Sequence, residues 1–485
     1  MTQRSRFFAL VPLVGALFAA PSRAAADELP IPVQTETLPN GLRVVLSPEH
    51  SAPTVAIAIY YDVGARVEER GRSGFAHLFE HMMFEGSANV AKGEHFRLIS
   101  QHGGDFNGTT SEDRTNYYET LPANALELGL WLEADRMRSL NVNSENFENQ
   151  RQTVMEERRQ SYENRPYMLS LLRRDELAYG DYFPYAHSVI GDTTDLEHAS
   201  LGDVRAFHDR YYVPNNAVLA IAGDFEPAQV LDLVRRHFGN IARHDLTAWH
   251  DPGFAGQTAE HVDSVTDAHA DLPAFHIVYH IPARRTPDHY ALEMLQIVLG
   301  DGESSRLYQQ LVKDREVASS IEVSTEDRRG PDLFTFFCVL AQGHTPSEVR
   351  PMVYAALDEI AHTGITGREL DKARNRVRAA FIMSLQSDLN RATHLAEYEM
   401  YDGNAALLRT ELDRYLAVTA EDVRRVAQQY FTVTNRTVLD VMPSSGPAAS
   451  SGTPAPTSSA PSAPAAPATP SSPQPAGSRR RGGAR

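Results

Sequence analysis

Cysteine is almost absent from this chain of 485 residues, which carries Cys338 alone. A single cysteine excludes any disulfide within the chain, so packing must stabilise the fold. Cys338 lies in the aromatic and β-branched run 334–340, which is typical of a buried strand. We therefore predict that its thiol is a small buried hydrophobic group and not a nucleophile.

Long hydrophobic runs are also scarce. Arg4 and Arg6 precede an apolar stretch of about 14 residues, and small residues follow it as far as Ala26. This stretch falls short of the roughly 20 residues that cross a bilayer as a helix. A basic start, a short apolar segment and an A-x-A site are typical of a secretory signal peptide, although a single-pass anchor is the rival interpretation. We predict that residues 1–26 are a signal peptide, and that the mature protein is periplasmic or secreted and not an integral membrane protein.

Basic residues are too few for a nucleic-acid-binding protein. The chain has 46 Lys and Arg against 63 Asp and Glu, a net charge of −17. Setting aside three arginines in 1–26 and four in 444–485, where no acid occurs, leaves 39 basic against 63 acidic residues, a charge of −24. This balance argues against a nucleic-acid partner. Residues 444–485, built from Pro, Ala, Ser, Thr and Gly, are predicted to form a disordered tail.

The run HLFEH at 77–81 is the clearest chemical signal in the sequence. On a helix, His77 and His81 share one face at about 6 Å between Cβ atoms, so both imidazoles can bind one zinc ion while Glu80 lies beside it. Ser73-Gly74 can cap such a helix. Polar groups in an apolar helix are costly without a partner, so a metal site is favoured over a solvated helix face.

A catalytic zinc ion takes three protein ligands and keeps one position open for water. The segment from Ser144 to Tyr162 is predicted to be a helix that Ser144 caps. Glu157 lies on its apolar stripe with Val154, whereas Glu156 is rotated off the stripe by about 100°. Glu157 is therefore the predicted third ligand. The alternative is a solvated glutamate like its neighbours.

The sequence contains a long internal repeat. Three short segments at 203–205, 211–212 and 215–219 recur about 219 residues later, at 422–424, 430–431 and 435–439. This period indicates two similar domains in tandem, each closing with a helix, a turn and an apolar strand; chance similarity of two helices is the alternative. Strand patterns at 54–63 and 275–281 and helix patterns at 123–137 and 349–362 predict an α+β fold.

Residues 73–87, SGFAHLFEHMMFEGS, resemble the inverted-zincin signature of the pitrilysin/insulinase metallopeptidases. The likeness covers most of 35–442, including GGDFNGTT at 103–110 and GESSRL at 302–307. In that family the third zinc ligand is a glutamate about 76 residues after the second histidine, which is Glu157 when counted from His81. The resemblance implies two α/β-sandwich domains related by a pseudo-twofold axis: a catalytic domain at 27–245 with one zinc ion, and a similar domain without metal at 246–443.

The resemblance also implies an activity. It predicts a zinc-dependent endopeptidase in which Glu80 is the general base for water at the metal. It further implies that an extended peptide or unfolded segment adds as a strand beside four residues of an exposed edge. The residues that match this edge are Asn107, Gly108, Thr109 and Thr110. An ordinary glycine-rich hairpin is the alternative interpretation of that stretch.

The chain departs from the family pattern in its second half. Many relatives carry an arginine and a tyrosine seven residues apart, which steady the substrate and the oxyanion. Val312 and Ser319 occupy these positions here and lack comparable donors. We therefore predict a homodimer, or a heterodimer with a related subunit, in which the partner supplies the pair. The alternative function is a non-catalytic scaffold or processing-complex subunit, but scaffolding does not require the four retained site residues.

Overall fold

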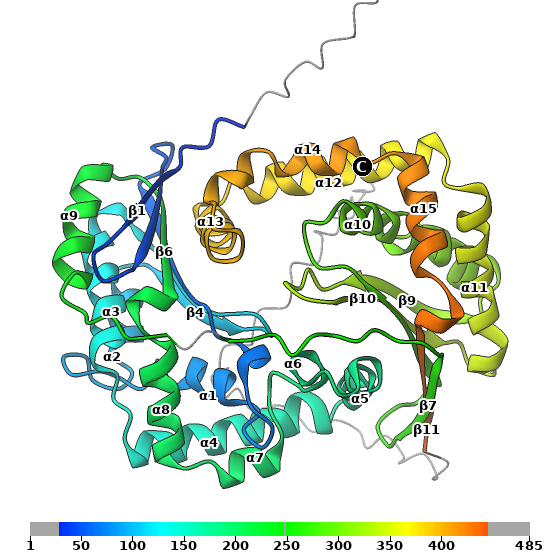
Figure 1. Cartoon of the computed structure of the whole chain (residues 1–485), viewed down its shortest axis with the longest axis horizontal. Coiled ribbons are helices and arrows are strands. Elements are labelled where there is room, and N and C mark those ends of the chain that lie inside the picture. The colour runs from blue at the N-terminus through cyan, green and yellow to red at the C-terminus, as the bar shows by residue number, and fades with distance from the viewer. Residues whose placement is uncertain (1–28, 247–248, 445–485) are drawn as a thin grey trace, which may run out of the picture.

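The computed structural model describes residues 29–246 and 249–444. The predicted signal peptide and the predicted tail beyond residue 444 lie outside these residues. The described chain forms two units, each built from one sheet and its helices, which face each other (Figure 1). Within the described residues, no helix combines the length and the apolar character that crossing a membrane requires.

The first sheet has six strands in the order β1-β2-β6-β3-β5-β4. Only β2 and β6 run parallel, and the other neighbours are antiparallel. β3 is almost wholly buried because helices cover both faces of the sheet, which explains its unbroken run of β-branched, alanine and tyrosine residues. The strands are β1 (Gln34–Thr37), β2 (Arg43–Pro48), β3 (Thr54–Tyr61), β4 (Asp105–Thr110), β5 (Thr115–Pro122) and β6 (Ala217–Gly223).

The second sheet repeats this topology with five strands in the order β7-β11-β8-β10-β9. If β1 is set aside, the two orders match strand for strand, and β7 and β11 form the parallel pair that corresponds to β2 and β6. The strands are β7 (His261–Asp267), β8 (Ala274–Ile281), β9 (Ala318–Thr325), β10 (Asp332–Leu340) and β11 (Arg436–Pro443). The predicted tandem α+β architecture is thus confirmed, and Cys338 is buried in β10 as expected.

The repeated sequence segments occupy equivalent places in the two halves. They lie on α8 (Leu201–Tyr211) and α15 (Ala420–Tyr430), each opened by a capping box, and then on β6 and β11. Asn216 donates a side-chain hydrogen bond to Tyr211 O at 2.9 Å, and Asn435 donates to Tyr430 O at 2.8 Å. The repeat therefore reflects one structural unit used twice.

Helices surround both sheets. The core of the first half lies between its sheet and α1, α3, α4, α8 and α9, and that of the second half between its sheet and α10, α11, α12 and α15. The remaining helices of the first half are α1 (Phe75–Met82), α2 (Glu94–Gln101), α3 (Leu126–Ser139), α4 (Ser144–Arg158), α5 (Met168–Tyr179), α6 (Phe183–Ala186), α7 (Thr193–His198) and α9 (Pro227–Phe238). Those of the second half are α10 (Pro287–Gly300), α11 (Pro346–Thr363), α12 (Gly367–Ser384), α13 (Asp388–Asp402) and α14 (Glu411–Ala417).

One helix from each half packs on the sheet of the other half. Ala392, Leu395 and Ala396 of α13 pack on the face of the first sheet that is turned towards the second half, against Ala56 and Ala58 of β3. In the same way α5 lies over β7, β8 and β11 of the second sheet. Figure 1 shows α13 beside the first sheet and α5 beside the second. The two halves are therefore interlocked through these helices.

The structure corrects one predicted helix cap and refines another. The cap of α4 is Asn143, whose side chain accepts from Asn146 N at 2.9 Å, and Ser144 is the first helical residue. The helix continues beyond Arg158 as a short π-helical segment to Glu163. Of the predicted pair Ser73-Gly74, Gly74 is the cap residue of α1, whereas the hydroxyl of Ser73 donates to Asp195 at 2.6 Å.

Candidate metal centre

Helix α1 begins at a tight approach between two loops. Gly74 precedes the helix with a φ of +87°, and a Cβ there would lie 2.8 Å from Gly191 Cα. The buried Glu68 carboxylate replaces the missing side-chain cap: it accepts from Gly74 N at 2.9 Å and Ala76 N at 2.8 Å. A carboxylate at this end of a helix also complements the helix dipole. His187 holds Glu68 from the other side, with Nε2 2.9 Å from Oε2.

Helices α1 and α4 bring together the three predicted ligands. The Nε2 atoms of His77 and His81 lie 3.8 and 3.2 Å from Glu157 Oε2, and the three donor atoms lie within 4.8 Å of one another. Two ligands at about 2 Å from a tetrahedral ion are about 3.3 Å apart, so this spacing fits a zinc ion. Glu156, by contrast, pairs with Arg159 on the surface. The stripe argument therefore selected the glutamate that faces the histidines.

Burial and the neighbouring charges set the protonation of this site. Burial, reinforced by the adjacent His81, lowers the pKa of His77 to about 4, so its imidazole is neutral. Burial opposes the charge of His81, but its hydrogen bond to Glu157 and the two nearby carboxylates outweigh this effect and raise its pKa. Burial also works against the charge of Glu157, yet contacts with both histidines lower its pKa. Neutral imidazoles and an ionised carboxylate are the forms that bind a metal ion.

Glu80 lies between the histidines and strand β4. It is partly buried, and burial raises its pKa, although a hydrogen bond from Thr110 acts in the opposite direction. Gly108 approaches it closely: a Cβ on Gly108 would lie 3.2 Å from Glu80 Cγ and 3.0 Å from the Tyr117 ring. A carboxylate with a raised pKa beside a metal site is suited to accept a proton near neutral pH.

Strand β4 forms one edge of the first sheet, and its backbone donors are partly bonded to its own side chains. Phe106 N donates to Asp105 Oδ1 at 3.0 Å, and Gly108 N donates to Asn107 Oδ1 at 2.8 Å. Thr109 turns its hydroxyl to Asn116 instead. The four predicted substrate residues therefore all lie on this edge, but only Gly108 and Thr110 approach Glu80.

Three further residues support the site, and they were not predicted as site residues. Glu68 caps α1, Gln150 hydrogen-bonds His81 from α4, and Arg114 donates from its Nη1 to Thr109 O at 3.0 Å. Their roles depend on partners that are distant in the sequence or lie across a turn. Gln150 was on the predicted stripe of α4, which was the only available signal.

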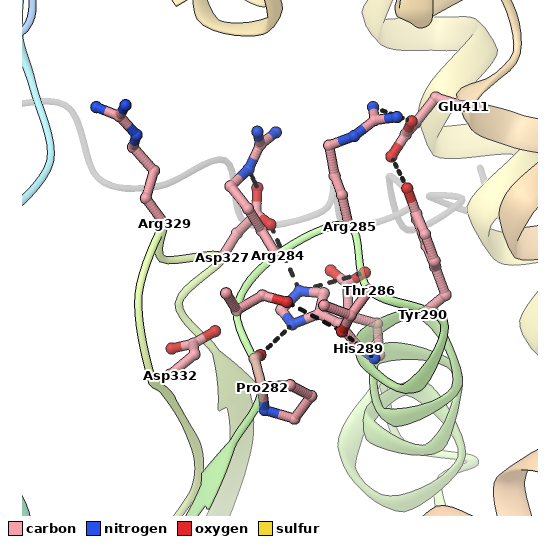
Figure 2. A network of polar contacts seen from close by, with 12 residues as sticks. Pro282, Arg284, Arg285, Thr286, His289, Tyr290, Asp327, Arg329, Asp332 and Glu411 are labelled. Carbon is pink, nitrogen blue, oxygen red and sulfur yellow. Dashed lines mark hydrogen bonds and ion pairs between the residues drawn. The ribbon is translucent and has the colours of Figure 1, made fainter. Parts of the chain in front are cut away.

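The second half places a different set of residues at the equivalent position. The first helix after β8 is α10, as α1 is the first after β3, and α10 carries His289 and Glu293. His289 Nε2 lies 3.4 Å from Asp327 Oδ1, and Arg284 pairs with the same carboxylate at 3.4 Å. Figure 2 shows Asp327 between these two side chains. Among the described residues of this half, no three His, Asp or Glu donors gather as they do at His77.

The sequence matches known proteins over both halves. Residues 43–181 match the family model described as insulinase (peptidase family M16), and residues 198–377 match the one described as peptidase M16 inactive domain. A zinc protease PqqE from Helicobacter pylori is 32% identical over 84% of this chain and 93% of its own length. A probable mitochondrial-processing peptidase subunit beta from Arabidopsis thaliana is 23% identical over 81% of this chain and 75% of that protein.

Solved structures agree with these matches. The crystal structure of a protease from Helicobacter pylori superposes with a TM-score of 0.81 at 30% identity, and covers 85% of this chain and 100% of that one. The resemblance that the HLFEH motif indicated is therefore confirmed. Two family models together span most of the described residues, and one relative is more than 30% identical over nearly its whole length. The chain therefore belongs to the insulinase family of peptidases, family M16.

Proposed function

We propose that this protein is a zinc-dependent endopeptidase with one catalytic zinc ion, held by His77, His81 and Glu157. The observation that carries the proposal is the approach of two imidazole Nε2 atoms to one Glu157 oxygen, at 3.8 and 3.2 Å, with Glu80 beside them. Relatives named as zinc proteases support it. The catalytic unit would be residues 27–245, and residues 246–443 would form the similar unit without metal.

When bound, zinc would supply Lewis acidity and lower the pKa of a coordinated water towards 7. Glu80 would accept a proton from the attacking water and would later deliver that proton to the leaving amine. Its raised pKa suits both roles. Glu68 would hold α1, and hence both histidines and Glu80, in one orientation through the helix N-terminus.

The substrate would bind as an added strand on β4, with its scissile carbonyl near Glu80. Peptide carbonyls would replace Asn107 Oδ1 as the acceptor of Gly108 N–H, while Thr110 and Gly108 border the reacting bond. Gly108 keeps the strand close to Glu80 because it has no side chain. Backbone pairing requires an extended chain, so peptides and unfolded segments would be cleaved and folded proteins would not.

Hydrolysis of a quenched peptide mixture tests the catalytic assignment. We expect Glu80→Gln to keep zinc but to lose about 10²–10⁴-fold in kcat, because it removes the proton acceptor and leaves the ligands in place. The matched control is Glu176→Gln, an exposed glutamate of α5, which should keep full activity. A Glu80→Gln enzyme that cleaves peptides at the wild-type rate would end the general-base assignment.

A partner subunit would complete the site. Val312 packs against the second core, and Ser319 donates its hydroxyl to Leu340 O at 3.0 Å, so neither offers a free donor to a substrate. A second copy or a related subunit would supply the arginine and tyrosine. Light scattering combined with the peptide assay tests this idea, which fails if the monomeric chain alone matches the activity of every assembly. Zinc binding without cleavage in any assembly would instead favour the scaffold alternative.

We also propose that residues 1–26 direct export and that the mature chain acts in the periplasm or outside the cell. The support is the basic, apolar and small-residue pattern of this segment. Cell fractionation, with N-terminal sequencing of the exported chain, tests the proposal. A start near Asp27 is the expected result, and an intact chain in the cytoplasm would refute it.

A further inference from the structure

A second group of donor side chains lies in the first half, separate from His77, His81 and Glu157. It consists of His95 on α2, Glu119 on β5 and Glu133 on α3, each less than 6% exposed. One donor atom from each lies within 4.8 Å of the other two, and His95 Nε2 is 3.5 Å from Glu119 Oε2. The elements α2, β5 and α3 thus bring one imidazole nitrogen and two carboxylates together in the buried interior.

Several of these donors have unmet hydrogen-bonding capacity. Both carboxylate oxygens of Glu119 and the Nε2 atom of His95 are buried and have no hydrogen-bond partner among the described residues. The helix α3 leaves room for this carboxylate: a Cβ on Gly129 would overlap Glu119 Oε1. A buried carboxylate without a partner is strongly destabilising, so this arrangement needs a further group to bind it.

The nearby arginine does not meet this need. Arg136 donates to both oxygens of Glu133, with Nε 2.9 Å from Oε2, and its guanidinium lies over the rings of Tyr117 and Phe84 at 4.3 and 5.4 Å. One cation therefore faces two carboxylates. Burial raises the pKa of Glu119 to about 7, despite Arg136, and lowers the pKa of His95 to about 3. Burial causes both shifts, and the positive charge of Arg136 adds to the lowering at His95.

We propose that His95, Glu119 and Glu133 form a second, structural zinc site. One imidazole and two carboxylates are a donor set that zinc accepts, and two carboxylates balance its charge while Arg136 is supported by the two aromatic rings. The ion would join α2, β5 and α3 behind β4, since the His95 ring lies 5.2 Å from the ring of Phe106 in that strand. This site does not depend on the proposed peptidase activity.

Metal counting on the full mature chain tests the site. The protein is stripped with chelator, reloaded with zinc, desalted and analysed for zinc per chain. We expect two zinc ions in the wild type, one in His77→Ala/His81→Ala, and one in Glu119→Gln, which keeps the side-chain shape but removes the charge. His102→Gln, an exposed histidine at the end of α2, is the matched control and should keep two.

A second measurement covers the case in which Glu119→Gln does not fold. X-ray absorption on zinc-loaded His77→Ala/His81→Ala should show a shell of nitrogen and oxygen with one imidazole, and zinc should raise the melting temperature of this variant. One zinc per wild-type chain, lost on mutation of His77 and His81, would overturn the second site and leave the catalytic proposal intact; a proton on Glu119 would then satisfy the cluster. Zinc lost only on mutation of Glu119 would instead refute the proposed catalytic centre.

Discussion

Replacement of Glu68 by alanine should destabilise the protein although Glu68 does not face the candidate metal centre. Its carboxylate accepts from Gly74 N, Ala76 N and His187 Nε2, and its side chain is fully buried. Removing one member of a buried charged pair costs about 3–5 kcal/mol, because the remaining donors stay buried without an acceptor. The exposed neighbour Glu69 offers a matched control, and Glu69→Ala should change the stability by less than about 0.5 kcal/mol.

This cost can be converted into a melting temperature. A helix of each half packs on the sheet of the other, so we expect the two halves to unfold together. About 410 residues at about 2.1 cal/mol/K each give an unfolding entropy of about 0.9 kcal/mol/K. Glu68→Ala should therefore lower the melting temperature by about 3–6 °C in calorimetry with chelator present, where metal binding cannot mask the change. A shift no larger than that of Glu69→Ala would refute the capping role.

The same variant should show a specific pH dependence. Burial alone would lower the pKa of His187, but the hydrogen bond and charge of Glu68 outweigh it and raise that pKa in the folded protein. A raised folded pKa contributes stability that is complete below the unfolded value of about 6.5 and is lost as the pH rises through the folded value. The difference in melting temperature between wild type and Glu68→Ala should thus be larger at about pH 6 than at about pH 9. An equal difference at both values would exclude a charged His187.

Two further substitutions test the site. Gly108→Val should keep zinc and lose most peptidase activity, because the valine side chain would collide with Glu80 and the Tyr117 ring. The control Gly367→Val should leave activity unchanged, because no atom lies within 4 Å of the added Cβ. Equal peptidase rates for the two variants would contradict the predicted strand position. Glu157→Gln should weaken zinc binding at least tenfold in a competition titration with a chromophoric chelator, whereas Glu156→Gln should not, and the reverse result would reassign the third ligand.

The sequence could predict the parts of this protein that depend on local spacing. A four-residue separation on one helix fixes the relation of His77 to His81, and the stripe of α4 distinguishes Glu157 from Glu156. The tandem repeat could be predicted because the closing helix, turn and strand use the same caps and the same asparagine contact in both halves. In each case the decisive contacts lie within a few residues of one another or recur at one interval.

Long-range contacts could not be predicted in the same way. The pattern of α13 shows that one face is buried, but not that this face lies on the sheet of the other half. Glu68 and His187 are 119 residues apart, and no periodicity links them. His95 and Glu133 likewise come from separate helices, so only the tertiary structure shows that their donor atoms lie close to Glu119. Local patterns predict buried faces, whereas the tertiary fold determines their partners.

The two halves show how one topology can carry different chemistry. Helices α1 and α10 follow equivalent strands, yet their N-termini differ. A left-handed glycine, whose N–H donates to Glu68, precedes α1, whereas Thr286 caps α10 with a hydroxyl that accepts from His289 N at 3.2 Å. In the second half Arg284 forms ion pairs with Asp327, Glu397 and Asp402, and the last two belong to α13. The position that carries candidate metal ligands in the first half thus carries ion pairs in the second half. These ion pairs hold α13, the helix that packs on the first sheet. Because equivalent backbone positions carry a candidate metal centre in one half and an ion-paired cluster in the other, the side chains, and not the topology, determine the chemistry.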